Sequence, residues 1–348
     1  GYFLNVRLKI AAMDDRMAVL GRQITMAVLW GILFHLVFGI FVYRVIFRRL
    51  HLLEEASAKM QTGDLSARAI WNASRSDELD DLGNSFNQMA GSIEDKVNTI
   101  QNQLSTISRL NDEMQNELDI GKDVQQAFFP DFSAFQEFKP SFVFMPLREV
   151  SGDMCNLYRF KDGDVGAFIG DAAGHGVSGA LITALVTSSM DGAIGRHKEP
   201  RELLESMNGE LCRRLTSTFY ATGIYVLIQK GRLLYSGAGH VDCLVYHRRK
   251  DEFSRLESQG TPIGLFEDMR YPQLEIPYEA GDRLVLLTDG LTEATAGDQE
   301  FGMERARELI RSTASMHSDA LSRALENSIR SFRTSETDDL TLLVMDLP

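Results

Sequence analysis

The stretch Gly170–Ala180, GDAAGHGVSGA, follows an apolar run and precedes a segment with helical spacing. Its glycines fit the G-x-G-x-x-G pattern of a dinucleotide-binding turn. Asp171, however, stands just before the glycines, where an unneutralised carboxylate repels a pyrophosphate. The Gly-Lys-Ser/Thr ending of a P-loop is missing as well. The stretch therefore predicts a strand, a turn and a helix, but not a nucleotide site.

The chain beyond Pro130 alternates short β-rich runs with helical segments. The predicted strands are Phe142–Met145, Val165–Ile169, Gly223–Gln229, Arg232–Ser236, Leu244–Tyr246, Arg283–Leu287 and Leu340–Met345. The predicted helices are Gly179–Gly192, Pro200–Leu215, Met303–Thr313 and Ser318–Ser331. Several strands follow one another directly, as in a hairpin around Lys230-Gly231. The pattern therefore predicts an α+β fold rather than a βα repeat.

Aspartates in or beside turns adjoin four of the apolar runs. They lie in SGDM at Asp153, FIGDAAGHG at Asp171, LLTDGLTEA at Asp289 and TDDLTLLV at Asp338-Asp339. Taken singly, each is explained as a turn residue or a helix N-cap. Taken together, aspartates at strand ends that meet at one edge supply the carboxylates that a pair of Mg²⁺ or Mn²⁺ ions requires. We therefore expect a metal site.

An apolar segment near the N-terminus predicts a membrane span. The residues Ile24–Tyr43, ITMAVLWGILFHLVFGIFVY, contain no Asp, Glu, Lys or Arg and are long enough to cross a bilayer as a helix. The arginine-rich RVIFRR follows, so the positive-inside rule places the rest of the chain in the cytoplasm. We expect a juxtamembrane segment over 1–23, the end of a missing external region, and a transmembrane helix over 24–46 in the inner (cell) membrane.

Two amphipathic helical stretches follow around Gly63-Asp64. The motifs GDL at Gly63–Leu65, DEL at Asp77–Leu79 and FNQM at Phe86–Met89 resemble a HAMP domain over residues 47–96. The usual proline at the start of the first helix is absent. The resemblance implies a dimeric four-helix bundle that relays a signal from the membrane.

A seven-residue repeat continues from this segment and predicts a coiled-coil linker over 97–128. The seam consists of Ile93, Val97, Ile100, Leu104, Ile107, Asn111, Met114 and Leu118. Asn111 falls at an a position, where a polar residue fixes the register of a two-stranded coil. The sequence therefore predicts a homodimer. The repeat breaks at Gly121, where we expect a flexible point.

Charge and cysteine content exclude other classes of protein. The chain has 36 basic and 49 acidic residues and a net charge of −13, so nucleic acid is not an expected partner. Cys155, Cys212 and Cys243 are far apart, which argues against a disulfide framework or a structural zinc site. A reducing cytosol is the expected setting.

The ordered motifs DVQQAFFP, REVSGDM, GDAAGHGVSGALITALV, SGAGH, TPIGL, GDRLVLLTDGLTEA and DDLTLLV resemble the SpoIIE-type branch of the PPM family of metal-dependent protein phosphatases. The resemblance covers about residues 120–348 and implies an α-β-β-α sandwich over 129–348. It implies hydrolysis of phosphoserine or phosphothreonine by a water on two Mn²⁺ or Mg²⁺ ions. The implied substrate is a phosphorylated STAS-type anti-sigma factor antagonist.

The same resemblance implies roles for individual residues. The implied metal ligands are Asp153, Asp171, the carbonyl of Ala172, Asp289, Asp338 and its neighbour Asp339. Asp171 bridges both ions, and with Asp153 and Asp289 it forms the catalytic set. The family's GGDxYD reads SGDMCN here, with Asn156 in place of the last acid.

Four further residues are expected to meet the substrate. Arg148 is spaced like the family's phosphate-holding arginine, although a solvent-exposed salt bridge explains it equally well. His175 is a candidate proton donor to the leaving oxygen. Gly174 and Gly176 leave room for the phosphate because they lack side chains. His240 is expected to be a turn or core residue.

Two other functions are compatible with parts of the sequence. A catalytically inactive HAMP-linked docking module is the alternative, and the intact aspartates weigh against it. A histidine kinase or chemoreceptor also carries a HAMP segment, but no H-box, ATP-binding glycine boxes or long receptor hairpin follow. A membrane-tethered phosphatase is therefore the preferred interpretation.

Overall fold

The structure is a computed structural model that describes residues 2–72, 77–214, 218–334 and 338–348. The chain divides into two compact units, Gly1–Asn111 and Asp112–Pro348. Each unit is described by itself below.

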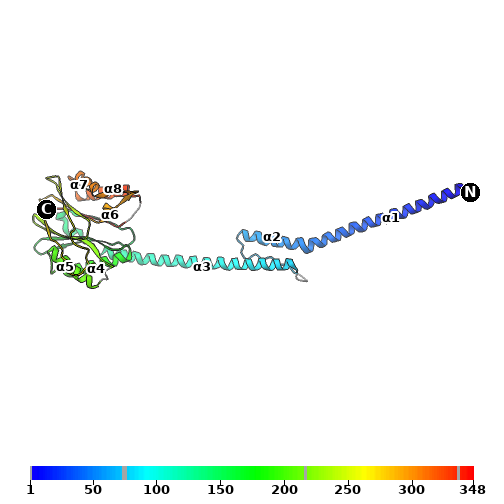
Figure 1. The fold of residues 1–348 in the computed structure, drawn as a ribbon, viewed down its shortest axis with the longest axis horizontal. Coiled ribbons are helices and arrows are strands. Elements are labelled where there is room, and N and C mark those ends of the chain that lie inside the picture. The colour runs from blue at the N-terminus through cyan, green and yellow to red at the C-terminus, as the bar shows by residue number, and fades with distance from the viewer. Residues whose placement is uncertain (1, 73–76, 215–217, 335–337) are drawn as a thin grey trace. The chain divides into compact units, whose positions relative to one another are not determined.

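The first unit is helical. Helix α1 (Tyr2–Val42) passes through a π-helical turn (Tyr43–Phe47) into α2 (Arg48–Gln61), without the proline that would break it (Figure 1). The predicted span of residues 24–46 falls inside this helical run. The segment Arg16–Gln61 contains a window with a mean hydropathy of 2.2 and no buried residues, so it is long and apolar enough to cross a membrane.

The connection between α2 and α3 (Glu78–Gln126) is held by side chains of both helices and of the connector, among them Asp77 of the DEL motif. The Asp77 carboxylate accepts the main-chain N–H groups of Leu79 and Asp80 and so caps α3. Arg49 of α2 pairs with Asp77 at 2.7 Å. The indole of Trp71 donates to Asp80 at 2.6 Å. These contacts join both helices through their connector.

Helix α3 continues without a break through Gly121 to Gln126 (Figure 1). The prediction of a flexible point at Gly121 is therefore wrong. A Cβ at Gly121 would lie 3.4 Å from Cγ1 of Val150, so the glycine marks the close approach of α3 to a neighbouring loop. Packing against that loop offsets the weak helix propensity of glycine, about 1 kcal/mol.

The second unit contains two five-stranded antiparallel sheets and a two-stranded ribbon. The first sheet has the order β1 (Ser141–Met145), β12 (Leu340–Asp346), β9 (Arg283–Leu287), β6 (Cys243–His247) and β7 (Glu252–Leu256). The second has the order β2 (Asp153–Arg159), β3 (Val165–Ala172), β4 (Ala221–Gln229), β5 (Arg232–Ala238) and β8 (Leu274–Pro277). The ribbon joins β10 (Thr295–Ala296) and β11 (Gln299–Glu300). A 3₁₀ helix (Phe132–Phe138) leads into β1.

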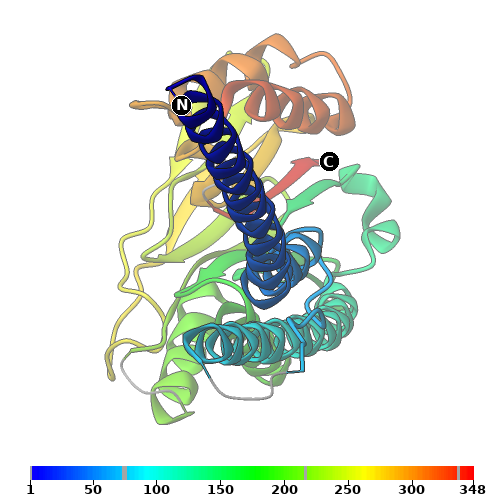
Figure 2. The same cartoon turned by 90° about the vertical axis from the view of Figure 1, so that its right-hand side faces the viewer.

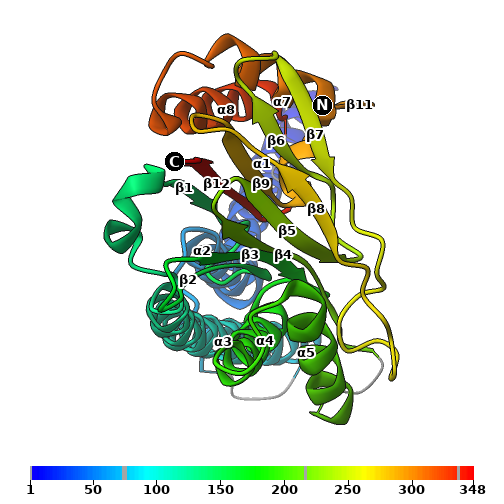
Figure 3. The same ribbon diagram turned by 90° about the vertical axis from the view of Figure 1, so that its left-hand side faces the viewer.

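The helices of the second unit cover the outer faces of the two sheets. Helices α4 (Val177–Ile194) and α5 (Pro200–Arg214) lie on the β2–β8 side, while α7 (Gly302–Ser312) and α8 (Ser318–Phe332) lie on the other (Figure 2 and Figure 3). Helix α4 is also long and apolar enough to cross a membrane, but its buried residues pack against the outer face of the β2–β8 sheet. Leu215, the last residue of the predicted helix Pro200–Leu215, lies outside the described residues.

The space between the sheets is filled by alternating apolar side chains. Ile169 and Val226 from one sheet and Leu286 and Leu343 from the other are all fully buried in one cluster. Two further clusters lie under the helix pairs. The predicted α+β class and the α-β-β-α sandwich are confirmed.

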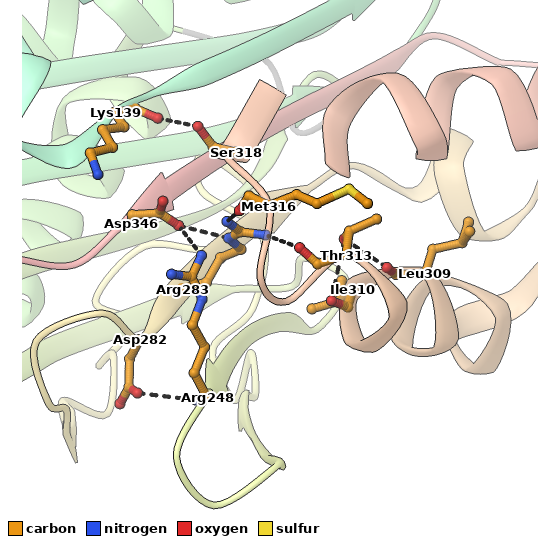
Figure 4. Close-up of polar contacts among 10 residues, drawn as sticks. All are labelled: Lys139, Arg248, Asp282, Arg283, Leu309, Ile310, Thr313, Met316, Ser318 and Asp346. Carbon is orange, nitrogen blue, oxygen red and sulfur yellow. Dashed lines mark hydrogen bonds and ion pairs between the residues drawn. The ribbon is translucent and has the colours of Figure 1, made fainter. Parts of the chain in front are cut away.

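A buried ion network anchors the loop between α7 and α8. Arg283, which has no solvent exposure, pairs through Nε with Asp346 at 2.7 Å across the β9–β12 ladder. Its other nitrogens donate to the carbonyls of Thr313 and Met316 (Figure 4). Arg248 shares Asp346 at 2.8 Å. The guanidinium thus ties the outer helices to the end of the sheet.

We predict that Arg283→Met lowers the free energy of unfolding of the second unit by about 3 kcal/mol, because it removes one of the two guanidinium partners of Asp346 and leaves the carbonyls of Thr313 and Met316 without their donor. The matched change Arg249→Met, at an arginine whose side chain is 76% exposed in its pair with Glu279, is expected to cost less than about 1 kcal/mol. Urea unfolding, monitored by the hydrogen exchange of peptides from β9 and β12, measures the loss of stability in both variants. Equal losses would contradict the role given to Arg283.

Candidate active site

The first two carboxylates lie opposite each other on neighbouring strands. Asp153 begins β2 and pairs in register with Asp171, near the end of β3. Asp153 is 1% exposed, and its carboxylate accepts a hydrogen bond from Oγ1 of Thr288 at 2.8 Å. Since Thr288 follows β9, this bond joins the two sheets at the edge where the site lies.

Asp289 and Asp338 come from the other sheet. Asp289 begins the short helix α6 (Asp289–Thr292) directly after β9, and Asp338 precedes β12. Between them, Gly290 packs on the main chain, where a Cβ would lie 1.9 Å from the carbonyl oxygen of Asp339. Only glycine permits this approach, so the TDG sequence brings the two aspartates to the same edge.

Asp339 is engaged differently from its neighbour. Its carboxylate accepts the main-chain N–H of Leu147 at 2.6 Å and that of Gly152 at 2.9 Å. It is buried, whereas Asp338 is exposed. Asp339 therefore holds the loop of residues 147–152, here called the site loop, which ends at Asp153.

The carboxylates of Asp153, Asp171, Asp289 and Asp338 repel one another. Burial, and then the charge of Asp171, raises the pKa of Asp153 well above its usual range. Burial, followed by repulsion from Asp289 and Asp338, raises the pKa of Asp171 to about 8. Burial is also the largest cause of the raised pKa values of Asp289 and Asp338. Such a cluster is stabilised by an added cation.

The chemistry of the donors fits a hard divalent ion. Oδ1 of Asp171 and the carbonyl oxygens of Ala172 and Gly174 converge on the space beside Gly152, within 2.7 to 3.1 Å of where a Cβ would lie. Carboxylate and carbonyl oxygens are the ligands that Mg²⁺ and Mn²⁺ prefer. Among the described residues, no three acidic, histidine or cysteine side chains enclose an ion by themselves. Mg²⁺ commonly takes only one or two carboxylates and retains water, so a loose cluster suffices.

The glycine-rich turn lies next to this cluster. Gly174 and Gly176 have φ values of +112° and +66°, which explains why glycines stand there. Cδ of Arg148 lies 3.7 Å from where a Cβ on Gly176 would be, so this arginine borders the turn. His175 is exposed. Burial raises the pKa of Asp338, and the nearby His175 ring partly offsets that rise. Arg148, Gly174, His175 and Gly176 therefore all lie at or next to the turn that follows Asp171.

Other residues at the site were not singled out by the sequence. Thr288 bonds Asp153, and Thr183 of α4 donates to the carbonyl of Gly152 at 2.9 Å. Gln125 of α3 bonds the main chain of Ser151 twice. Only the position of Thr288 beside Asp289 offered a sequence signal.

His240 is buried, as expected for a core residue. Its Nδ1 lies 3.0 Å from Oγ1 of Thr222, and its Nε2 lies 3.1 Å from the carbonyl oxygen of Leu287. Burial lowers its pKa to about 4, so the ring is neutral and Nε2 donates to the carbonyl. His240 therefore supports the junction of the two sheets.

Comparison with known proteins agrees with this architecture. Residues 161–348 match the family of Stage II sporulation protein E (SpoIIE), and residues 41–95 match the HAMP domain. The phosphoserine phosphatase RsbU of Bacillus subtilis is 23% identical over 69% of this chain and 72% of its own length. The phosphoserine phosphatase RsbP of the same organism is 32% identical over 44% of this chain. The chain spans only 40% of RsbP.

A solved structure has the same fold. The SiaA-PP2C domain of Pseudomonas aeruginosa superimposes with a TM-score of 0.63 at 23% identity, covering 68% of this chain and 98% of that one. The two-sheet sandwich is that of a PP2C-type protein serine/threonine phosphatase. The SpoIIE match covers more than half of the sequence, and the chain belongs to the SpoIIE family.

We predict that Gly152→Ala lowers phosphoester hydrolysis about a hundredfold, because the added methyl group displaces the oxygens of Asp171 and Ala172. Gly195→Ala is the matched control, since a Cβ there has nothing within 4 Å and its φ is −70°. Initial rates on para-nitrophenyl phosphate measure the effect. A wild-type rate in Gly152→Ala would show that this space is not part of the site.

Proposed function

We propose that the chain is a membrane-anchored signalling phosphatase that removes phosphate from phosphoserine or phosphothreonine of a STAS-type anti-sigma factor antagonist. The observation that carries the proposal is the gathering of Asp153, Asp171, Asp289 and Asp338 from both sheets at one edge. The phosphoserine phosphatases among its relatives support the reaction. The choice of a STAS-type partner rests on family resemblance.

A pair of Mn²⁺ or Mg²⁺ ions fits this edge. Asp153, Asp171, Asp289, Asp338 and the carbonyl of Ala172 would hold the ions. When bound, such a pair supplies a nucleophilic water at neutral pH and neutralises charge on the phosphate. Asp339 had been expected among the ligands. Both of its carboxylate oxygens accept main-chain N–H groups, so we assign it to holding the site loop.

The side chains around the glycine-rich turn would orient the substrate. Arg148 borders Gly176 and carries the guanidinium that suits a phosphate group. His175 is exposed beside Asp338, from where it would deliver a proton to the leaving serine or threonine oxygen. Gly174 and Gly176 keep the turn free of side chains where the phosphate enters.

The N-terminal unit would anchor and control the enzyme. The apolar helix that precedes the HAMP segment supports a membrane anchor, and the arginines that follow it support a cytoplasmic phosphatase domain. On α3, the seam residues Ile100, Leu104 and Ile107 are more than half exposed in the single chain. Exposed apolar residues at heptad spacing support a homodimer through the HAMP segment and coiled coil.

We predict that the chain hydrolyses para-nitrophenyl phosphate only with Mn²⁺ or Mg²⁺, and that Asp171→Asn and Asp289→Asn each reduce the rate by about a hundredfold or more. Each variant removes the negative charge of an expected metal ligand. This should weaken cation binding at least as much as the loss of a residue that only hydrogen-bonds to a ligand. Assays with each cation and with a chelator test the prediction.

The exposed Asp298→Asn is the matched control and should keep the wild-type rate. Added Mn²⁺ should raise the melting temperature of the wild type and of the control more than that of Asp171→Asn. Turnover in the presence of chelator, or full activity of both site variants, would refute the metal mechanism.

We predict that a fragment of residues 48–128 sediments as a dimer at tens of micromolar. Ile107→Lys should convert it to a monomer, because a charge enters the apolar seam. Asn102→Lys, at an exposed position away from the seam, should remain dimeric. A monomeric wild-type fragment in analytical ultracentrifugation would contradict the proposed assembly.

A further inference from the structure

The start of α2 carries two cations that have no partner among the described residues. Arg44 lies in the π-helical turn, and Arg48 is the first residue of α2. They are four residues apart, so their side chains lie on the same side of the helical run. In the described part of the chain, neither guanidinium has a hydrogen bond or an ion pair, whereas Arg49 pairs with Asp77 at 2.7 Å. Both side chains are exposed and free to bind a ligand.

These arginines line a groove between the start of α2 and the connector that leads to α3. The groove has a volume of about 450 Å³. The helical run contributes Arg44 and Arg48, and the connector contributes Ile70 and Trp71. Ile70 is 74% exposed. The indole of Trp71 donates to Asp80 at 2.6 Å, so the connector side of the groove is fixed to α3.

The apolar stretch Ile24–Tyr43 places this groove at the membrane surface. A helix of that length rises by about 30 Å, which equals the thickness of the hydrocarbon layer. Arg44 follows directly, and Arg48 lies about 6 Å farther along the helix, a distance that stays within the headgroup layer. The connector residues that line the same groove share this level. The headgroup layer contains the phosphate groups that guanidinium groups bind, and tryptophan is enriched there.

Membrane topology alone does not account for this arrangement. The positive-inside rule requires only that arginines stand near the end of the span. It does not require a groove beside them, or an exposed isoleucine on the connector at the same level. An apolar side chain is unfavourable in water but is stabilised among acyl chains. Two unpaired cations beside an exposed apolar residue therefore fit a ligand that is both anionic and apolar.

We propose that this groove, here called the interface groove, binds an anionic phospholipid. The guanidinium groups of Arg44 and Arg48 hold the lipid phosphate, and Ile70 contacts the acyl chains near the glycerol. An anionic headgroup is preferred over a zwitterionic one, because the cation of a zwitterionic headgroup is repelled by the arginines. The proposal rests on the membrane anchor proposed above. Its consequence is that the lipid holds the connector and the start of α2 together at the membrane surface.

The test uses the full chain with Trp30→Phe, which leaves Trp71 as the only tryptophan, since the chain contains two. This parent protein is reconstituted into vesicles of phosphatidylcholine and phosphatidylglycerol in equal parts. Bromine atoms, which quench tryptophan fluorescence at short range, are carried near the glycerol end of the acyl chains by one lipid or by the other. Brominated phosphatidylglycerol should quench Trp71 at least about twofold more than brominated phosphatidylcholine.

Arg44→Gln combined with Arg48→Gln should bring this quenching ratio to about one, because the lipid phosphate loses both of its donors. The matched control is Lys59→Gln combined with Lys96→Gln, which removes two cations from exposed positions farther along α2 and on α3. The control should keep the preference of the parent protein. A ratio of about one in the parent protein, or an equal loss in both double variants, would overturn the proposal.

Free phosphate and the membrane anchor are tested separately. Millimolar inorganic phosphate should leave the lipid preference unchanged, and a loss of the preference would show that the groove takes free phosphate instead of a lipid. Flotation of the vesicles on a density gradient tests the anchor independently of the groove. If the protein does not float with the vesicles, the membrane anchor fails and the lipid site fails with it. If it floats but shows no preference, the lipid site alone is refuted.

Discussion

Mutual repulsion among buried carboxylates is the constraint on which the second unit depends. Asp153 and Asp171 lie opposite each other in one sheet, and Asp289 joins them from the other. Gathering such groups costs free energy, which has to come from elsewhere in the fold. The structure supplies it with three apolar clusters and with main-chain ladders that fix the strands in register. The site is thus a strained feature that the sandwich core supports.

The site also exists only where the two sheets meet. Thr288 follows one sheet and donates to Asp153 of the other, and His240 links Thr222 to Leu287 in the same region. Each sheet alone would present only two of the four aspartates at its edge. Packing of the two sheets against each other therefore brings the carboxylates together. For this reason, a small displacement of one loop is expected to lower the rate of turnover.

Much of this architecture could be predicted from the sequence, because strand ends marked by aspartate and glycine give strong local signals. The pattern does not predict strands β2, β7 and β8 or the ribbon of β10 and β11, since each is short or mixes polar with apolar residues and is fixed by its pairing partner. The sequence does not predict that the helix continues through Gly121, because a glycine where the heptad repeat breaks is typical of a helix end. The helix continues because it packs against the loop that contains Val150. The contact of Gln125 with Ser151 joins residues on different elements, which no local pattern in the sequence records.

The contact between Gly290 and the carbonyl of Asp339 has a consequence for how this enzyme can change over time. It sets the spacing of Asp289 and Asp338 through backbone atoms, independently of side-chain rotamers or of the exact shape of the core. Apolar residues elsewhere in the sandwich can then be exchanged for others of similar volume without altering that spacing. A catalytic geometry fixed in this way tolerates extensive sequence drift, as long as one position keeps no side chain at all.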